Sequence, residues 1–288
     1  MNITTEKINK VKVKPLVNNI TEDITEVKGK QLFKNNLSNI YIMARKRSGK
    51  SSLIGTILKK MTDKRSSVII FSSTIKIDPC WIAIKKDLEK RGITTLTYTH
   101  FIDDNKNNIL EQFLKDLEGD SEDEEPTTEN KICGDGTRLK FVPYEKEIKK
   151  EDKPRKPKTS VPDYIICYDD LSSDLRHSIV SSCLKSNRHK KIMNIISSQY
   201  LNDLNRPALR NLDYMIMFKG QDHEKLELIH RSLDLGISLE DFEKLYHYAV
   251  DDPYSFLYID IRNDQYRKNF NEKIMVKKNY LLYNKQYG

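Results

Sequence analysis

The chain has 288 residues, of which 38% are hydrophobic and 32% charged, with a net charge of +8 and a pI near 9.0. This length allows one sizeable α/β domain with extensions, and the composition predicts a soluble protein with a modest core. No apolar run reaches the roughly 18 residues of a membrane span, and residues 1–25 lack the apolar segment of a signal peptide. We therefore expect an intracellular protein without a membrane span. Its basic charge favours an anionic partner, such as nucleotide or nucleic acid.

The N-terminal part of the chain changes character near residue 37. Residues 1–36 have little apolar periodicity and are predicted to be a flexible or loosely docked arm, so that the folded domain begins at 37. Asn39–Met43 is predicted as a buried strand and Ser52–Met61 as a helix. The sequence between them fits a phosphate-binding loop except at its first position. The candidate nucleotide-binding residues are Ala44, Arg45, Lys46, Arg47, Ser48, Gly49, Lys50, Ser51 and Ser52.

Each part of this loop has a physical task. A glycine before the lysine lets the backbone fold so that successive N–H groups point toward phosphate oxygens. Lys50 would reach the β- and γ-phosphates of ATP, Ser51 would bind Mg²⁺, and the helix N-terminus would add partial positive charge. Ala44 stands where the pattern has glycine, and one additional methyl group still allows the loop to form. The alternative is a basic turn that merely enters a helix.

The next elements alternate between strands and helices. Ser67–Ser73 is predicted as a strand that forms a βαβ unit with the first strand and helix. A helix over Pro79–Lys90 carries the only tryptophan, Trp81, which we expect to serve packing rather than function. A short strand over Thr94–Thr99 and a helix over Asn108–Leu117 follow.

Residues 119–160 interrupt this alternation and are predicted to be an insertion or mobile loop. An acidic tract opens the segment, a lysine-rich stretch with two prolines closes it, and residues 131–144 suggest a small hairpin. The simplest interpretation is a solvated linker. A sharper hypothesis is that the basic half contacts DNA.

The run Tyr164–Asp170 is an apolar strand that ends in two carboxylates, as expected of a Walker B strand. Asp169 would hold Mg²⁺ through water, opposite Ser51. Asp170 would act as general base or position the attacking water. Its side chain is one methylene shorter than the more common glutamate, which leaves the attack geometry open. The alternative is a strand that simply ends in a polar turn.

A third strand, starting at Ile192, ends at Gln199, which is a candidate for sensing the γ-phosphate or holding the attacking water. The alternative is a solvated strand end.

The remaining expected elements are a serine-capped helix over 172–185, a strand over 214–218, helices over 224–233 and 239–248, a strand over 255–261 and a basic tail over 263–288. Strands alternating with helices predict an α/β P-loop NTPase with a mainly parallel central sheet flanked by helices. The four cysteines, Cys80, Cys133, Cys167 and Cys183, are scattered, which argues against structural zinc.

Several of these motifs occur together in one known family. Lys50-Ser51, Asp169-Asp170, Arg188-His189, the strand ending in Ser198-Gln199, Leu204, Pro207, Arg210-Asn211 and the run Asp252–Phe256 are the residues that carry the resemblance. Over residues 38–262 the chain resembles the DNA-packaging ATPases of the FtsK–HerA superfamily, in particular the poxvirus-type enzymes of large nucleocytoplasmic DNA viruses and virophages. The motifs are specific jointly rather than singly, and Ala44 is the main departure.

The resemblance implies a RecA-like or FtsK–HerA-like fold and a motor that uses ATP and Mg²⁺ to thread double-stranded DNA into a capsid. It also implies a homo-oligomeric ring, a hexamer or pentamer, that contacts the capsid or its portal vertex and acts in the viral factory of the host cytoplasm or in the virion. In such rings an arginine from the neighbouring subunit completes each active site, and Arg188 and Arg210 are the two candidates. Two alternatives stay open: another P-loop enzyme, such as a helicase-like ATPase or nucleotide kinase, and a non-catalytic basic scaffold with a decayed loop.

Overall fold

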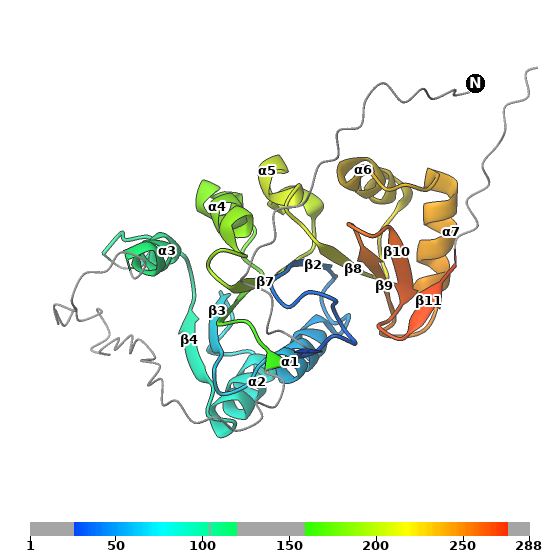
Figure 1. The fold of residues 1–288 in the computed structure, drawn as a ribbon. Helices are drawn as coiled ribbons and strands as arrows, with labels where there is room; N and C mark the ends of the chain where they lie inside the picture. Colours follow the sequence, from blue (N-terminus) through cyan, green and yellow to red (C-terminus); the bar gives the residue numbers. More distant parts are fainter. Residues whose placement is uncertain (1–25, 104, 120–158, 276–288) are drawn as a thin grey trace, which may run out of the picture.

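The computed structural model describes residues 26–103, 105–119 and 159–275. In this part of the chain the main sheet has nine strands in the order β11-β10-β9-β8-β2-β7-β6-β3-β4 (Figure 1). Its strands are β2 (Asn39–Met43), β3 (Ser67–Ser72), β4 (Thr94–Tyr98), β6 (Tyr164–Asp169), β7 (Ile192–Ser198), β8 (Tyr214–Phe218), β9 (Phe256–Asp260), β10 (Gln265–Lys268) and β11 (Glu272–Ile274). Two short parallel strands, β1 (Glu26–Val27) and β5 (Thr159–Ser160), form a separate pair.

The six strands from β4 to β8 run parallel, whereas β9, β10 and β11 each pair antiparallel to their neighbour. The prediction of a mainly parallel α/β sheet is therefore confirmed. Parallel strands need helical crossovers that cover both faces, and the chain supplies them as α1 (Lys50–Met61), α2 (Pro79–Lys90), α3 (Ile109–Gly119), α4 (Ser178–Ser186) and α5 (Arg206–Leu209). Two further helices, α6 (His223–Leu233) and α7 (Leu239–Ala249), connect β8 to its antiparallel neighbour β9.

The helices divide between two layers, one on each face of the sheet (Figure 1). Helices α1 and α2 pack on one face, where Ile54, Ile57 and Trp81 meet side chains of the central strands. Helices α3 to α7 pack on the other face, over a second apolar cluster. All five residues of β2 are buried, as expected of a central strand covered on both sides.

The register of the parallel strands brings their carboxyl ends to one edge of the sheet. Met43 at the end of β2 pairs with Ser198 of β7 and Met217 of β8. Asp169 at the end of β6 pairs with Ser197 of β7 and with Ser72 of β3. We call this edge the carboxyl edge. Loops that follow these strands meet here, which is where parallel α/β sheets bind their ligands.

Two local predictions need correction. The first strand–helix–strand unit does form a parallel crossover, but β7 and β6 lie between β2 and β3 in the sheet. The helix expected over 172–185 is divided into a 3-10 turn, Asp174–Arg176, and helix α4. The ring of His177, rather than a serine hydroxyl, accepts the capping hydrogen bond from the N–H of Ile179.

The predicted domain boundaries also shift where the structure describes them. Leu32 and Phe33 are buried in the core cluster that contains α1, so the packed domain begins before residue 37. Residues 265–274 form β10 and β11, so the strand expected over 255–261 is not the last. Residues 1–25, the expected hairpin over 131–144 and residues 276–288 lie outside the described residues. Among the helices described, none is both long and apolar enough to cross a membrane.

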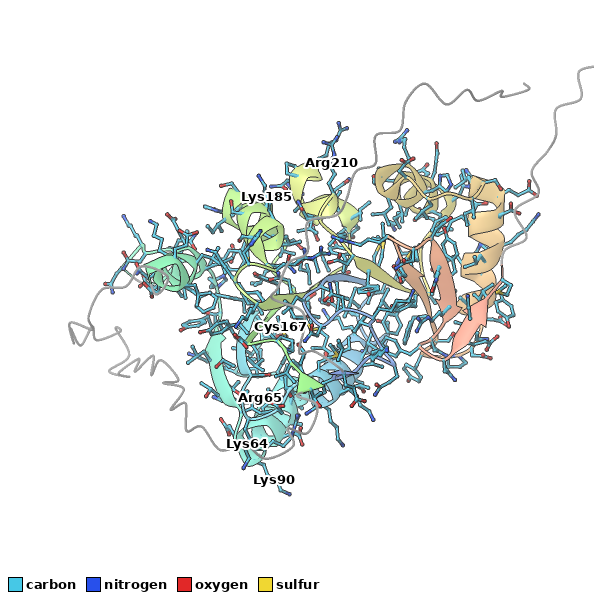
Figure 2. The ribbon with its side chains drawn as sticks, in the orientation of Figure 1. Lys64, Arg65, Lys90, Cys167, Lys185 and Arg210 are labelled. Carbon is cyan, nitrogen blue, oxygen red and sulfur yellow. The ribbon has the colours of Figure 1, made fainter. Side chains whose placement is uncertain are left out.

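Thiol accessibility tests this core. Cys80 is exposed, whereas Cys167 and Cys183 are buried, and Figure 2 shows Cys167 within the sheet. Burial raises the pKa of the Cys183 thiol to about 11, so few of these groups ionise at mildly alkaline pH. In a Cys133→Ser variant we expect Ellman's reagent to react rapidly with Cys80 alone, and with the two buried thiols only after denaturation. Rapid reaction of a second thiol in the native protein would contradict the packing described here.

Candidate nucleotide-binding site

The loop between β2 and α1 folds as a compact turn at the carboxyl edge. Gly49 adopts a φ of 97° and Arg47 a φ of 63°, both in the left-handed region. Ser48 Oγ donates a hydrogen bond of 2.8 Å to the carbonyl of Arg45. Gly49 caps α1 through its own backbone, so the first N–H groups of a twelve-residue helix face the loop. This is the arrangement by which a helix N-terminus binds phosphate.

Ala44 fits this loop without strain. Its N–H donates to the carbonyl of Ser198 at 3.1 Å, which fixes the start of the loop against the end of β7. The side chain is only 1% exposed and packs in the core beneath the loop. Ala44 is not among the described residues with positive φ, so the position does not require glycine.

Lys50 connects the loop to both carboxylates at the end of β6. Its Nζ lies 3.0 Å from Oδ1 of Asp169 and 2.6 Å from Oδ1 of Asp170. Burial alone would lower the pKa of Lys50, but the two carboxylates outweigh it and raise this pKa above its ordinary value. Lys50 is therefore a cation near neutral pH, at the point where a phosphate chain would meet the helix.

Asp169 is held from the other side by the tryptophan. Trp81 Nε1 donates a hydrogen bond of 2.7 Å to Oδ2 of Asp169, and the indole is completely buried. Trp81 lies in the first turn of α2, where Asp78 caps the helix and Pro79 occupies its first position. One carboxylate oxygen of Asp169 thus contacts α2, while the other faces Lys50. The expectation that Trp81 packs is met, but the contact of its N–H with Asp169 was not anticipated.

These residues fit a hydrated Mg²⁺ ion. Asp169 is 1% exposed, and the described partner of its Oδ1 is the ammonium group of Lys50, 3.0 Å away. In the described part of the chain no group of three or more His, Cys, Asp and Glu side chains could form a cage for a metal. Mg²⁺ commonly binds through one or two carboxylates together with water and substrate phosphates. Asp169, with Ser51 at the start of α1, matches that donor set.

Gln199 follows β7 and lies at the same edge, because Ser198 pairs with the first residue of the loop. A buried carboxylate supports this region. Asp203 accepts hydrogen bonds from the hydroxyls of Ser198 and Ser172, and so connects the end of β7 with the segment after Asp170. Asp203 was not singled out from the sequence. Only its position, four residues after Gln199, could have indicated it.

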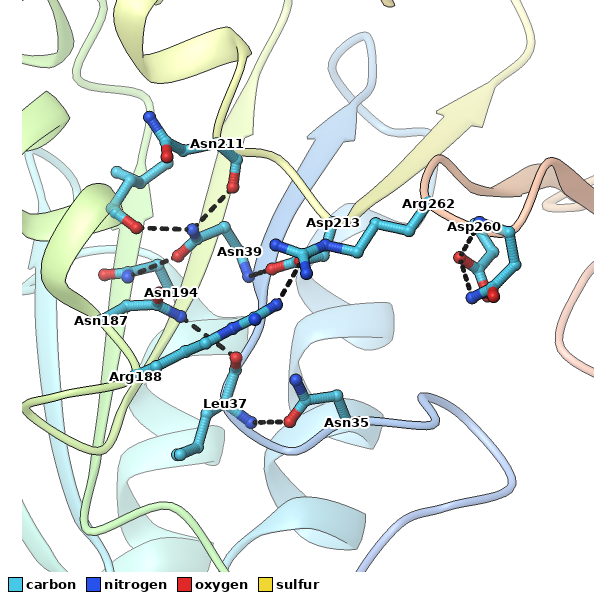
Figure 3. Close-up of polar contacts among 12 residues, drawn as sticks. Asn35, Leu37, Asn39, Asn187, Arg188, Asn194, Asn211, Asp213, Asp260 and Arg262 are labelled. Carbon is cyan, nitrogen blue, oxygen red and sulfur yellow. Dashed lines mark hydrogen bonds and ion pairs between the residues drawn. The ribbon is translucent and has the colours of Figure 1, made fainter. Parts of the chain in front are cut away.

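The two candidate arginines lie elsewhere. Arg188 precedes β7, at the edge of the sheet opposite Lys50, and its Nη2 lies 3.3 Å from Oδ1 of the buried Asp213 (Figure 3). Arg262 contacts the same oxygen through Nε at 2.5 Å. Arg210 is exposed and points outward beyond α5 (Figure 2). Neither candidate reaches the phosphate-binding loop of its own chain, so a role in catalysis would require a neighbouring subunit.

The network around Asp213 gives Arg188 a structural task (Figure 3). Asp213 accepts the backbone N–H of Asn39 at 2.9 Å, and Asn39 bonds in turn to Asn194 and to the carbonyl of Asn211. These contacts tie together the starts of β2, β7 and β8. Because Asp213 is 3% exposed, its charge needs the two guanidinium groups.

Replacing Trp81 tests its link to Asp169. In Trp81→Phe the ring stays apolar but Oδ2 loses its donor, and we expect the free energy of unfolding to fall by about 2–3 kcal/mol. Because residues that orient metal ligands tune metal affinity, the Mg²⁺ concentration for half-maximal ATP hydrolysis should rise about 10-fold or more. Chemical denaturation and a Mg²⁺ titration of ATPase activity measure the two effects.

Phe242→Leu in α7 is the matched control for Trp81→Phe, because Phe242 is also fully buried but packs in the opposite helical layer. It should lower stability without changing the Mg²⁺ requirement. Equal Mg²⁺ curves for both variants would mean that Trp81 serves packing alone.

A helix N-terminus behind a glycine-containing loop, a half-buried lysine, and paired carboxylates two strands away in a parallel sheet together define a P-loop fold. No protein-family model matches the sequence, and no curated protein matches it. Among solved structures, the chain is similar to the genome packaging NTPase B204 of Sulfolobus turreted icosahedral virus 2, in complex with AMP. The two chains are 17% identical, with a TM-score of 0.49, over 84% of this chain and 100% of the other.

Two further solved structures extend this comparison. The DNA-packaging ATPase B204 of Sulfolobus turreted icosahedral virus is 19% identical over 81% of this chain and 97% of its own, with a TM-score of 0.49. The cytoplasmic domain of the type VII secretion ATPase EccC of Thermomonospora curvata is 13% identical over 76% of this chain and 24% of its own, with a TM-score of 0.38.

Proposed function

We propose that this protein is an ATP-hydrolysing motor that moves double-stranded DNA into a viral capsid. The observation that carries the ATPase part is the cluster of Lys50, Asp169 and Asp170 at the carboxyl edge, beside a helix N-terminus. The DNA part rests on the resemblance to FtsK–HerA packaging ATPases and on the net charge of +8.

In this proposal the chain's residues divide the chemistry among them. ATP draws the ammonium group of Lys50 away from the carboxylates and onto its β- and γ-phosphates, where it offsets charge in the transition state. Asp170, released from Lys50, accepts a proton from the attacking water, and Gln199 orients that water. Trp81 keeps Asp169 in place while Lys50 moves.

Asp169 and Ser51 would hold Mg²⁺, which would supply positive charge to neutralise part of the phosphate charge when bound. An arginine of the neighbouring subunit, Arg188 or Arg210, would complete the site. Arg210 is the more available of the two because Arg188 is paired with Asp213. A role for Arg188 would require it to leave that pair, and the buried carboxylate of Asp213 would then keep Arg262 as its one described ion-pair partner.

Basic side chains support contact with a polyanion. Lys64, Arg65 and Lys90 project from the α1–α2 side, and Lys185 and Arg210 project from the other helical layer (Figure 2). Charge on both sides suits a ring subunit that meets DNA on one surface and neighbours on others. We place such a ring at the capsid or its portal vertex, in the viral factory of the host cytoplasm or in the virion.

The test is steady-state ATP hydrolysis by the purified full-length protein, with and without linear double-stranded DNA, at low and moderate salt. We expect DNA to stimulate hydrolysis several-fold, and the stimulation to weaken as salt rises because phosphate contacts release counterions. An ATP hydrolysis rate that is the same with and without DNA would refute the proposed motor function and favour a nucleotide kinase or another P-loop enzyme. Stronger activation by single strands would favour a helicase, and nucleotide binding without turnover would favour a non-catalytic scaffold.

A further inference from the structure

The strand order fixes the direction in which a nucleotide can lie across the loop. The γ-phosphate must face Asp170 and Gln199, which follow β6 and β7 on one side of β2. On the other side of β2 lie β8 and then β9. In the proposed orientation, with the γ-phosphate on the β6–β7 side, the base extends toward the loop after β8 and the turn before β9.

An exposed aromatic side chain stands at this place. Tyr254 lies in the turn before β9 and is 73% exposed, among the most exposed large apolar or aromatic side chains described. Its ring borders the phosphate-binding loop, since a Cβ built on Gly49 would lie 3.3 Å from Tyr254 Cδ1 and 4.0 Å from Phe218 Cε1. The solvent-facing ring is thus beside the residue that precedes Lys50.

The backbone of Tyr254 adopts an unfavourable conformation. Tyr254 has a φ of 63°, a left-handed value that is rare for bulky side chains. Asp252 and Ser255 close a turn whose two central residues are Pro253 and Tyr254. Tyr254 takes the second central position with positive φ, which glycine or asparagine normally occupies. Lys268 pairs with Asp252 at 2.5 Å and anchors the turn to β10. Strain of this kind, kept by surrounding contacts, is a feature of ligand-binding residues.

We propose that Tyr254 forms the base-binding platform of the site, on which the adenine ring of ATP stacks. This inference rests on the proposed nucleotide site and adds the residue that recognises the part of ATP beyond its phosphates. Tyrosine offers a flat apolar face at low entropic cost. Stacking on an aromatic face is tolerant of base identity, because every base has such a face. Tyr254 would therefore select strongly for nucleotides over inorganic polyphosphate. It would select only weakly between ATP and GTP.

The experiment compares the binding of Mg-ATP and of tripolyphosphate, which lacks the base, by isothermal titration calorimetry. Tyr254→Asn removes the ring but keeps a residue that tolerates left-handed φ. We expect it to weaken ATP binding by about 5- to 150-fold, the range for loss of one stacked base, and to leave tripolyphosphate binding within about 2-fold. Tyr254→Phe keeps the stacking face and should bind ATP like the unmodified protein. Ile102→Asn, at an exposed site between β4 and α3, is the control for loss of surface apolarity.

Each result has one meaning. Unchanged ATP affinity in Tyr254→Asn would overturn the base platform. An equal loss of ATP and tripolyphosphate binding would also overturn it, since the loop itself would then be disturbed. If the unmodified protein binds neither ligand, the nucleotide site itself is refuted, which separates failure of the proposed function from failure of this inference.

Discussion

Lys50→Ala is expected to reduce ATP hydrolysis by about 10²- to 10³-fold, the usual cost of removing one group that stabilises charge in a transition state. The side chain of Lys50 is only 11% exposed and is the one described cation in contact with both Asp169 and Asp170. The loss should occur with and without DNA. A coupled assay of phosphate release measures it.

Lys46→Ala is the matched control, because Lys46 belongs to the same loop but is exposed. It should retain turnover within a few-fold of the unmodified protein. Comparable losses in both variants would mean that general positive charge in the loop, rather than the contacts of Lys50, supports hydrolysis.

Lys50→Ala should also lower the free energy of unfolding in the absence of nucleotide. Without Lys50, the buried Asp169 faces Asp170 with no cation between them, and breaking a buried ion pair costs about 3–5 kcal/mol. Because Asp170 is partly exposed, we expect the lower end of that range. Adding Asp170→Asn to Lys50→Ala should restore part of the loss, since one of the two like charges is then removed. A double-mutant cycle measures this coupling.

Much of the central sheet could be predicted because its strands are buried on both faces. Runs such as Asn39–Met43 and Tyr164–Asp169 are almost wholly apolar, and each is followed by polar residues where the strand reaches the carboxyl edge. The helices α1 and α2 follow from apolar periodicity and from the proline at the start of α2. These are local signals, which a sequence displays directly.

The antiparallel extension was harder to anticipate. Residues 265–274 are rich in charged side chains, and they form strands because β9 offers an edge with free backbone groups. Their hydrogen bonds depend on a neighbouring strand rather than on their own apolar content. The short N-terminal segment is similar, since its Phe33 is buried by packing against the distant rings of Tyr214, Tyr258 and Phe270.

For the site, sequence motifs indicated the residues that would meet the phosphates but not those that support them. Lys50, Asp169 and Asp170 come together as the loop and strand patterns predict. Trp81 is 88 residues from Asp169 in the chain, and they meet only because β3 lies next to β6. That neighbour relation is a property of strand order, which no local pattern encodes.

Asp170→Asn should separate ATP binding from ATP cleavage. Asp170 has a φ of 52°, and asparagine is among the residues that tolerate this conformation, so the substitution removes the charge without straining the backbone. If Asp170 takes the proton of the attacking water, kcat should fall by about 10²- to 10⁴-fold. ATP affinity should be retained or improved, because Lys50 then loses its ion pair with Asp170 and is held by Asp169 alone. Single-turnover hydrolysis and calorimetric ATP binding give the two values.

Asp169→Asn is the informative partner of this variant, since the amide oxygen of asparagine can still accept the N–H of Trp81. It should raise the Mg²⁺ requirement, whereas Asp170→Asn should leave that requirement unchanged and lower the maximal rate. The two neighbouring carboxylates would then have different roles because their surroundings differ: Asp169 is buried and fixed by an indole, and Asp170 is partly exposed at the turn.

If Asp170→Asn instead turns over normally, the proton must be taken elsewhere. Gln199 cannot act as a base, so it would then orient a water that loses its proton directly to the phosphate, and Asp170 would serve only to hold Lys50 before ATP arrives.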